Sequence, residues 1–107
     1  MLGCSVIGNY HGENSGFTFD WHVTSGSVKM ITTDIRVRGP NGEVGSCNGV
    51  TLENGINFRT DCLVKLSEKT GVPNGNWDVI IGSRPEATIG YILLQIGADF
   101  YITSDKQ

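Results

Sequence analysis

The sequence predicts an all-β protein, a compact antiparallel β-barrel or β-sandwich of seven to eight short strands. Polar and apolar residues alternate with a period of two in several segments, and 15 glycines divide the 107 residues into short pieces. No ten-residue segment combines helical periodicity with a cap and a stop signal. A chain of this length is expected to form one β-domain, here residues 1–107.

The clearest predicted strand is 17–24, where Phe17, Phe19, Trp21 and Val23 alternate with polar residues. A second run, 28–38, ends at a Gly-Pro-Asn-Gly turn, and residues 43–47 return as its partner strand. The first residues of that run are out of phase with its later half, which predicts a bulge near Met30.

Residues 50–58 are a weaker strand segment, interrupted by a turn at Glu53-Asn54-Gly55, and further strands follow it. They are expected at 62–66, 77–81, 87–96 and 100–103. Residues 63–69 are the nearest candidate for a helix, but the β-rich residues before them and the Gly-Val-Pro after them favour a strand. Residues 104–107 are predicted to be a frayed tail.

The cysteine pattern indicates one local disulfide and one leftover thiol in a small β-protein of the secreted kind. Cys47 and Cys62 flank a turn-rich segment, whereas Cys4 stands alone near the N-terminus. Bridges from Cys4 to either of the other two cysteines are the alternatives. In the chain-entropy model, a bridge that closes a loop of about 15 residues contributes roughly 3 kcal/mol to stability.

Composition and charge argue against several classes of partner. The formal net charge is −3 without a cluster of lysines or arginines, so we expect no nucleic-acid partner. No apolar run approaches the roughly 20 residues of a membrane span. The first residues lack the basic and apolar regions of a signal peptide, which fits a cytosolic protein or the mature form of a secreted one.

Four polar residues near the N-terminus are weak candidates for a metal site, namely His11, Glu13, Asp20 and His22. Asp20 and His22 share a strand face, and imidazole and carboxylate are suitable ligands for zinc. We favour the simpler interpretation that these are ordinary polar residues on a solvated strand face and in the loop before it. No metal and no cofactor is therefore expected.

Asp34, Arg36 and Arg38 form a charged stripe on one strand face. The stripe is interpreted either as a recognition site for an anionic ligand or partner, or as solubilising charge with cross-strand pairs to residues such as Glu43. We favour the second interpretation.

The loop around Asn74, Asn76 and Trp77 combines amides with an aromatic ring, a combination that suits ligand binding and sugars in particular. Trp77 also begins an apolar alternation, which favours a core residue whose indole N–H meets a backbone acceptor.

An enzyme is not expected. A Cys4 nucleophile with His11 or His22 as base is conceivable, but the sequence lacks the context of any known nucleophile motif.

The order of these features resembles the Alternaria alternata allergen 1-like family, the fungal secreted β-barrel allergens and elicitor effectors. The features that carry the resemblance are an early lone cysteine, the Trp21-His22-Val23 strand, a Pro-Asn-Gly turn, and then Cys47 and Cys62. The resemblance spans Cys4 to Cys62, and this chain has no later cysteine where the family usually has a second disulfide. It implies a Cys47–Cys62 staple, a homodimer linked through Cys4, and a secreted protein that acts on a host by binding.

The favoured function is a secreted, non-enzymatic binding protein of the effector, elicitor or allergen type, with a host or partner protein as target. Its binding residues are expected on loops such as 9–16 and 72–76. The first alternative is a small lectin-like module that binds glycans through Asn74, Asn76 and Trp77. The second is a cytosolic β-sandwich interaction or immunity protein with three reduced cysteines.

Overall fold

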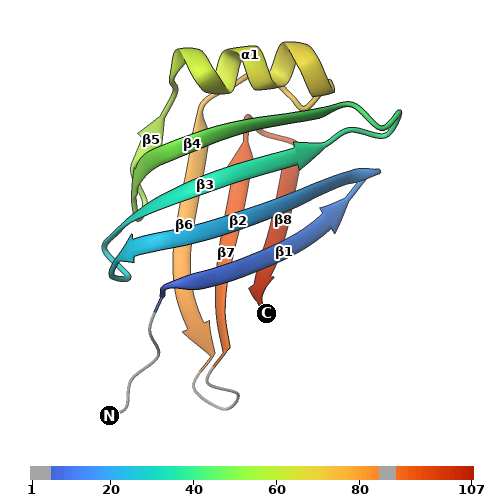
Figure 1. The fold of residues 1–107 in the computed structure, drawn as a ribbon. Coiled ribbons are helices and arrows are strands. Elements are labelled where there is room, and N and C mark those ends of the chain that lie inside the picture. Colours follow the sequence, from blue (N-terminus) through green and yellow to red (C-terminus); the bar gives the residue numbers. More distant parts are fainter. Residues whose placement is uncertain (1–5, 85–88) are drawn as a thin grey trace.

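The computed structural model describes residues 6–84 and 89–107 and confirms the all-β prediction in its barrel form (Figure 1). Eight antiparallel strands make one nearly closed barrel, to which a single short helix is added. In chain order the elements are β1 (Gly8–Asn14), β2 (Phe17–Gly26), β3 (Met30–Arg38), β4 (Val44–Glu53), β5 (Asn57–Phe58), α1 (Asp61–Thr70), β6 (Trp77–Arg84), β7 (Ile89–Ile96) and β8 (Phe100–Lys106).

The strands form two meanders that meet along one pair of strands. The order across the sheet is β4-β3-β2-β1-β8-β7-β6-β5, so β1 pairs with β8 and joins the two halves. Figure 1 shows β1–β4 crossing in front of β6–β8, so that the two halves face each other as layers. The helix lies at one end of the barrel, beside β4.

The core lies between the layers and is built by the predicted alternation. On β2, Phe19, Trp21 and Val23 are buried while the residues between them are exposed. The side chains of Phe19, Trp21 and Trp77 contact one another with ring centroids 5.9–6.2 Å apart. The Trp21 indole Nε1 donates to the hydroxyl of Ser104 at 3.0 Å, so this buried polar group is satisfied across the barrel.

The barrel has a seam where β4 and β5 do not pair, and Asn54 bridges it at one end. The Asn54 side-chain amide donates to the carbonyls of Val28 (2.8 Å) and Ile81 (3.1 Å), and its oxygen accepts from the Ile81 N–H (3.3 Å). One side chain therefore links the β2–β3 turn to β6. Asn54 belongs to the predicted turn at residues 53–55, so the turn supplies the side chain that bridges the seam.

The prediction of a strand at 62–66 is wrong, because residues 61–70 form the helix α1. Thr60 is its N-cap and accepts the N–H of Leu63 at 3.3 Å, while Gly71 ends the helix in the left-handed conformation and donates to Ser67. Leu63, Leu66, Ser67 and Thr70 are the buried residues of the helix and recur at helical spacing.

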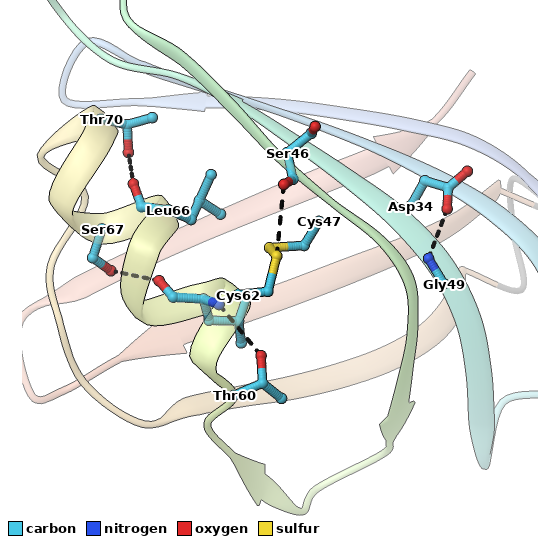
Figure 2. Close-up of a disulfide and its surroundings, with 10 residues drawn as sticks. Asp34, Ser46, Cys47, Gly49, Thr60, Cys62, Leu66, Ser67 and Thr70 are labelled. Atoms are coloured by element: carbon cyan, nitrogen blue, oxygen red, sulfur yellow. Dashed lines mark hydrogen bonds between the residues drawn. A yellow bond between two sulfur atoms is a disulfide. The ribbon is translucent and has the colours of Figure 1, made fainter.

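A disulfide joins Cys47 on β4 to Cys62 in the first turn of α1, as Figure 2 shows. The two α-carbons lie 5.9 Å apart, within the usual range for a disulfide. Cys47 is buried in the core, whereas Cys62 is exposed. The bridge therefore staples a helix to a strand, where the sequence predicted a staple between two strands.

Two further expectations are corrected at the strand ends. Residues 104–106 are not a frayed tail but the end of β8, where Lys106 pairs with Tyr10 and the Gln107 N–H donates to Asn9 at 2.8 Å. No bulge lies at Met30, which pairs with Glu53 and begins β3 directly after a tight turn. The register shifts instead at Thr24 of β2 and opposite Asp34, where β4 carries two residues against one.

Two expectations concern residues outside this description. Cys4 and the start of the 87–96 segment lie outside the described residues. Within that segment, β7 runs from residue 89 as the predicted strand and lies between β6 and β8. None of the described helices is long and apolar enough to cross a membrane.

The disulfide gives a first prediction. Replacing both Cys47 and Cys62 with Ala should lower the free energy of unfolding by about 3 kcal/mol and the melting temperature by about 10–20 °C, because the unfolded chain regains a 15-residue loop. Thermal denaturation followed by circular dichroism measures this shift. Lys65→Ala on the exposed side of α1 is the matched control, and an unchanged melting temperature in the double variant would contradict the staple.

Candidate functional site

The outer face of β1–β4 carries a groove of about 520 Å³, lined by polar side chains together with Tyr10, Trp21 and Ile35. Because inward residues of these strands form the core, the residues between them point outward and meet across the strands. His11 pairs with Asp20, Asp20 with Arg36 and Arg36 with Ser46, so these residues form one polar row over four strands. We call this site the β1–β4 groove; its lining includes His11, Asp20, His22, Asp34, Arg36 and Asn48.

His11 is held between two carboxylates at one side of the groove. Its Nδ1 lies 2.7 Å from Asp20 and its Nε2 lies 2.9 Å from Glu13. A carboxylate accepts hydrogen bonds, so both ring nitrogens donate and the imidazole is in its charged form in this arrangement. The hydrogen bond to Glu13 and then that to Asp20 raise the pKa of His11 above 6.5.

Two other lining residues are engaged within the sheet. The Nδ1 of His22 lies 2.6 Å from the Asn9 side-chain oxygen. Asp34 accepts the backbone N–H of Gly49 at 2.8 Å, which closes the bulge of β4 (Figure 2). The bulge thereby fixes the position of Asn48 at the edge of the groove.

The candidate metal residues are partly brought together. His11, Glu13 and Asp20 converge, whereas His22 is bound to Asn9. A metal ligand needs a free nitrogen lone pair, and both nitrogens of His11 are occupied by carboxylates. Over residues 6–84 and 89–107, no group of three or more His, Cys, Asp and Glu side chains has a geometry suited to a metal ion.

The two arginines of the charged stripe are left without partners. In the part of the chain that the structure describes, neither the Arg36 nor the Arg38 guanidinium makes a salt bridge or hydrogen bond. The expected cross-strand pair with Glu43 does not form among the described residues, where the Oε1 of Glu43 is buried without a hydrogen-bond partner. Arg36 therefore offers a free planar donor within the groove.

The predicted ligand residues of the 72–77 loop do not form one site. Trp77 is fully buried in the aromatic core, so its ring is not available to stack on a ligand, and the core interpretation is confirmed. Its indole N–H has no acceptor among the described residues, contrary to the expectation of a backbone partner. Asn74 accepts from Arg59 at 3.1 Å, and only Asn76 lines a surface pocket.

The suggested Cys4 nucleophile lies outside the described residues, but its suggested bases can be located. His11 has both ring nitrogens bound to carboxylates, and His22 shares one with Asn9. His11 therefore has no free nitrogen with which to accept a proton from a nucleophile.

Comparison with known proteins identifies no relative. No family model, no curated protein and no solved structure matches the chain. The resemblance to the fungal allergen family therefore stays a prediction.

The sequence pointed to Arg36 and to His11 separately, but it did not show that they line one groove. Ser46 and Asn48 were missed altogether, because their positions depend on the β3–β4 register and on the bulge at Gly49. The local signal of that bulge is Gly49 after Asn48, because a glycine in the left-handed conformation (φ 66°) is typical of a bulge.

The pKa of His11 gives a second prediction. A proton titration of the His11 ring by NMR should give a midpoint above 6.5, and Asp20→Asn should lower it because one carboxylate acceptor is lost. Because the pKa is raised on folding, these hydrogen bonds stabilise the fold fully below the unfolded pKa of about 6.5. That contribution is lost as the pH rises through the folded pKa.

Asp34→Asn, whose carboxylate contacts Gly49 and not His11, is the control for the same titration. A wild-type midpoint at or below 6.5 would show that the two carboxylates do not hold His11 in solution.

Proposed function

We propose that the protein is a secreted, non-enzymatic binding module whose β1–β4 groove receives an acidic segment of a host or partner protein. The barrel acts as the rigid scaffold and the outward residues of β1–β4 supply the contacts. Recognition then uses the hydrogen-bond donors of the groove, and no covalent step is involved.

The unpaired Arg36 carries this proposal. Guanidinium groups bind carboxylates through two parallel hydrogen bonds, and this geometry is the strongest common contact between an arginine and an acidic side chain. Arg36 lies directly opposite Ser46, while Asn48 stands at the bulge beside it. The hydroxyl and the carboxamide add neutral donors next to the cation.

The acidic residues nearest to Arg36 are already used by other groups. Asp20, its cross-strand partner on β2, is hydrogen-bonded to His11, and Asp34 accepts the Gly49 N–H. An acceptor from outside the chain therefore meets a guanidinium that has no internal partner. Arg38, two residues along the same face, extends the donor surface toward the β3–β4 turn.

The disulfide supports the secreted part of the proposal. Disulfides persist in oxidising compartments, and small extracellular domains rely on them for stability. The resemblance to the fungal allergens and effectors supports a host protein as the target and a role in virulence. The alternative function, a cytosolic immunity protein, requires three reduced thiols. Alkylation followed by intact-mass measurement counts these thiols directly.

Binding of an acidic peptide tests the proposal. Hexaglutamate added to the full chain should shift the backbone amide signals of β2–β4 around Arg36, and Arg36→Ala should weaken binding at least about tenfold, or ~1.4 kcal/mol. Affinity should also fall as His11 loses its proton, because the Glu13–His11–Asp20 cluster then becomes more negative.

Lys65→Ala removes the same charge from α1, outside the groove, and should leave the affinity unchanged. Shifts that map to α1, or equal losses in both variants, would mean that the peptide follows general charge and not the groove.

A further inference from the structure

A second polar row lies on the outer face of the other layer. Asn57 on β5 is directly opposite Asp78 on β6, which is in turn directly opposite Gln95 on β7. With Asn76 and Gly97 these residues line a pocket of about 260 Å³. Three carboxamides and one carboxylate thus surround one small hollow, without an arginine or a lysine in its lining.

Asp78 is the unusual member of this row. Its Oδ1 is buried and has no hydrogen-bond partner within residues 6–84 and 89–107. A buried acceptor without a donor costs free energy, so native proteins rarely keep one that serves no purpose.

The pocket is held in place by contacts on both sides. The Gln95 side chain donates to the carbonyl of Gly97 at 3.0 Å, which fixes the carboxamide at the pocket wall. The loop that carries Asn76 is tied to its surroundings by two bonds, Ser67 to the Pro73 carbonyl (3.2 Å) and Arg59 to Asn74 (3.1 Å). The Gln95 carboxamide and the loop that carries Asn76 are therefore held in position before any ligand binds.

An apolar hollow adjoins the polar pocket. Its volume is about 390 Å³, its lining includes Pro73, Ile96, Ala98 and Phe100, and it shares Gly97 with the polar pocket. Beyond Gln95, the next residue across the sheet is Tyr101 on β8, of which 49% is exposed. The surface around Gly97 therefore changes from hydrogen-bonding to apolar over a short distance.

We propose that this surface is a carbohydrate-binding site for a single pyranose ring. A sugar has one edge of hydroxyls, each both donor and acceptor, and an apolar C–H face. The Asp78 carboxylate accepts from hydroxyls, the carboxamides of Asn57, Asn76 and Gln95 donate and accept, and the apolar hollow receives the C–H face.

The lining disfavours other ligand classes. An anion would be repelled by Asp78, the only charged group of the polar pocket. A calcium ion takes six to eight oxygen ligands, usually from several carboxylates, whereas among the described residues the only carboxylate that lines the polar pocket is Asp78 and the only one that lines the adjoining hollow is Asp99. The site lies on the other layer from the β1–β4 groove. A test of this site is therefore independent of a test of the protein partner proposed above.

The test begins with an NMR screen of the full chain against free glucose, galactose, mannose and N-acetylglucosamine, each at about 10 mM so that weak binding is detected. The sugar that binds is then titrated as the free monosaccharide while the backbone amide signals are followed by NMR. Shifts are expected at Asn76, Asp78 and Gly97, with a dissociation constant of about 1 mM for so small a pocket. Asp78→Ala and Gln95→Ala should each weaken binding at least about tenfold.

Glu68→Gln removes a carboxylate from the exposed side of α1 and should bind as the wild type does. Thermal denaturation checks that Asp78→Ala remains folded, and its stability should not fall because an unsatisfied buried oxygen is removed. A sugar whose shifts map to the β1–β4 groove, calcium chloride that shifts these amides when no sugar does, or the absence of binding by any of these sugars would each overturn the proposal.

Discussion

The structure depends on how the seam between β4 and β5 is held closed without backbone pairing. On the opposite side β1 and β8 join the two meanders by strand pairing. At the seam the Asn54 side chain and the Gly55 backbone N–H bind β6, while the disulfide holds α1 against β4. The helix packs so closely that a Cβ at Gly45 would lie 2.6 Å from Leu66. A larger residue at position 45 would therefore displace the Leu66 side chain from β4.

The two polar faces follow from the same strand geometry that builds the core. Along β2 and β6 each buried aromatic or aliphatic residue is followed by an outward one, and antiparallel register aligns the outward residues of neighbouring strands. Asp20 and Asp78 occupy equivalent places in their rows but have different surroundings. Asp20 is satisfied by His11, whereas the Oδ1 of Asp78 lacks a donor among the described residues.

Most of the fold could be predicted from the sequence, because alternation at Phe19, Trp21 and Val23 directly reports which face is buried. The helix was missed because its apolar residues also fit a short strand, although Thr60 and Gly71 mark its two ends. The geometry of the candidate site was harder to predict from the sequence. The contact between His11 and Asp20 depends on register, and the inward direction of Trp77 separates it from Asn76. Sequence proximity alone does not reveal either relation.

The way in which β1 meets β8 has a consequence for the order of folding. Strands β1–β4 pair in chain order, and so do β6–β8, whereas the contact between Tyr10 and Lys106 spans nearly the whole sequence. Loop closure over such a distance is slow compared with hairpin formation. We therefore expect each meander to form early and the barrel to close last, with the apolar faces of both layers open to solvent in the interval. Oxidation of Cys47 and Cys62 before closure would hold α1 against β4 and shorten that exposure.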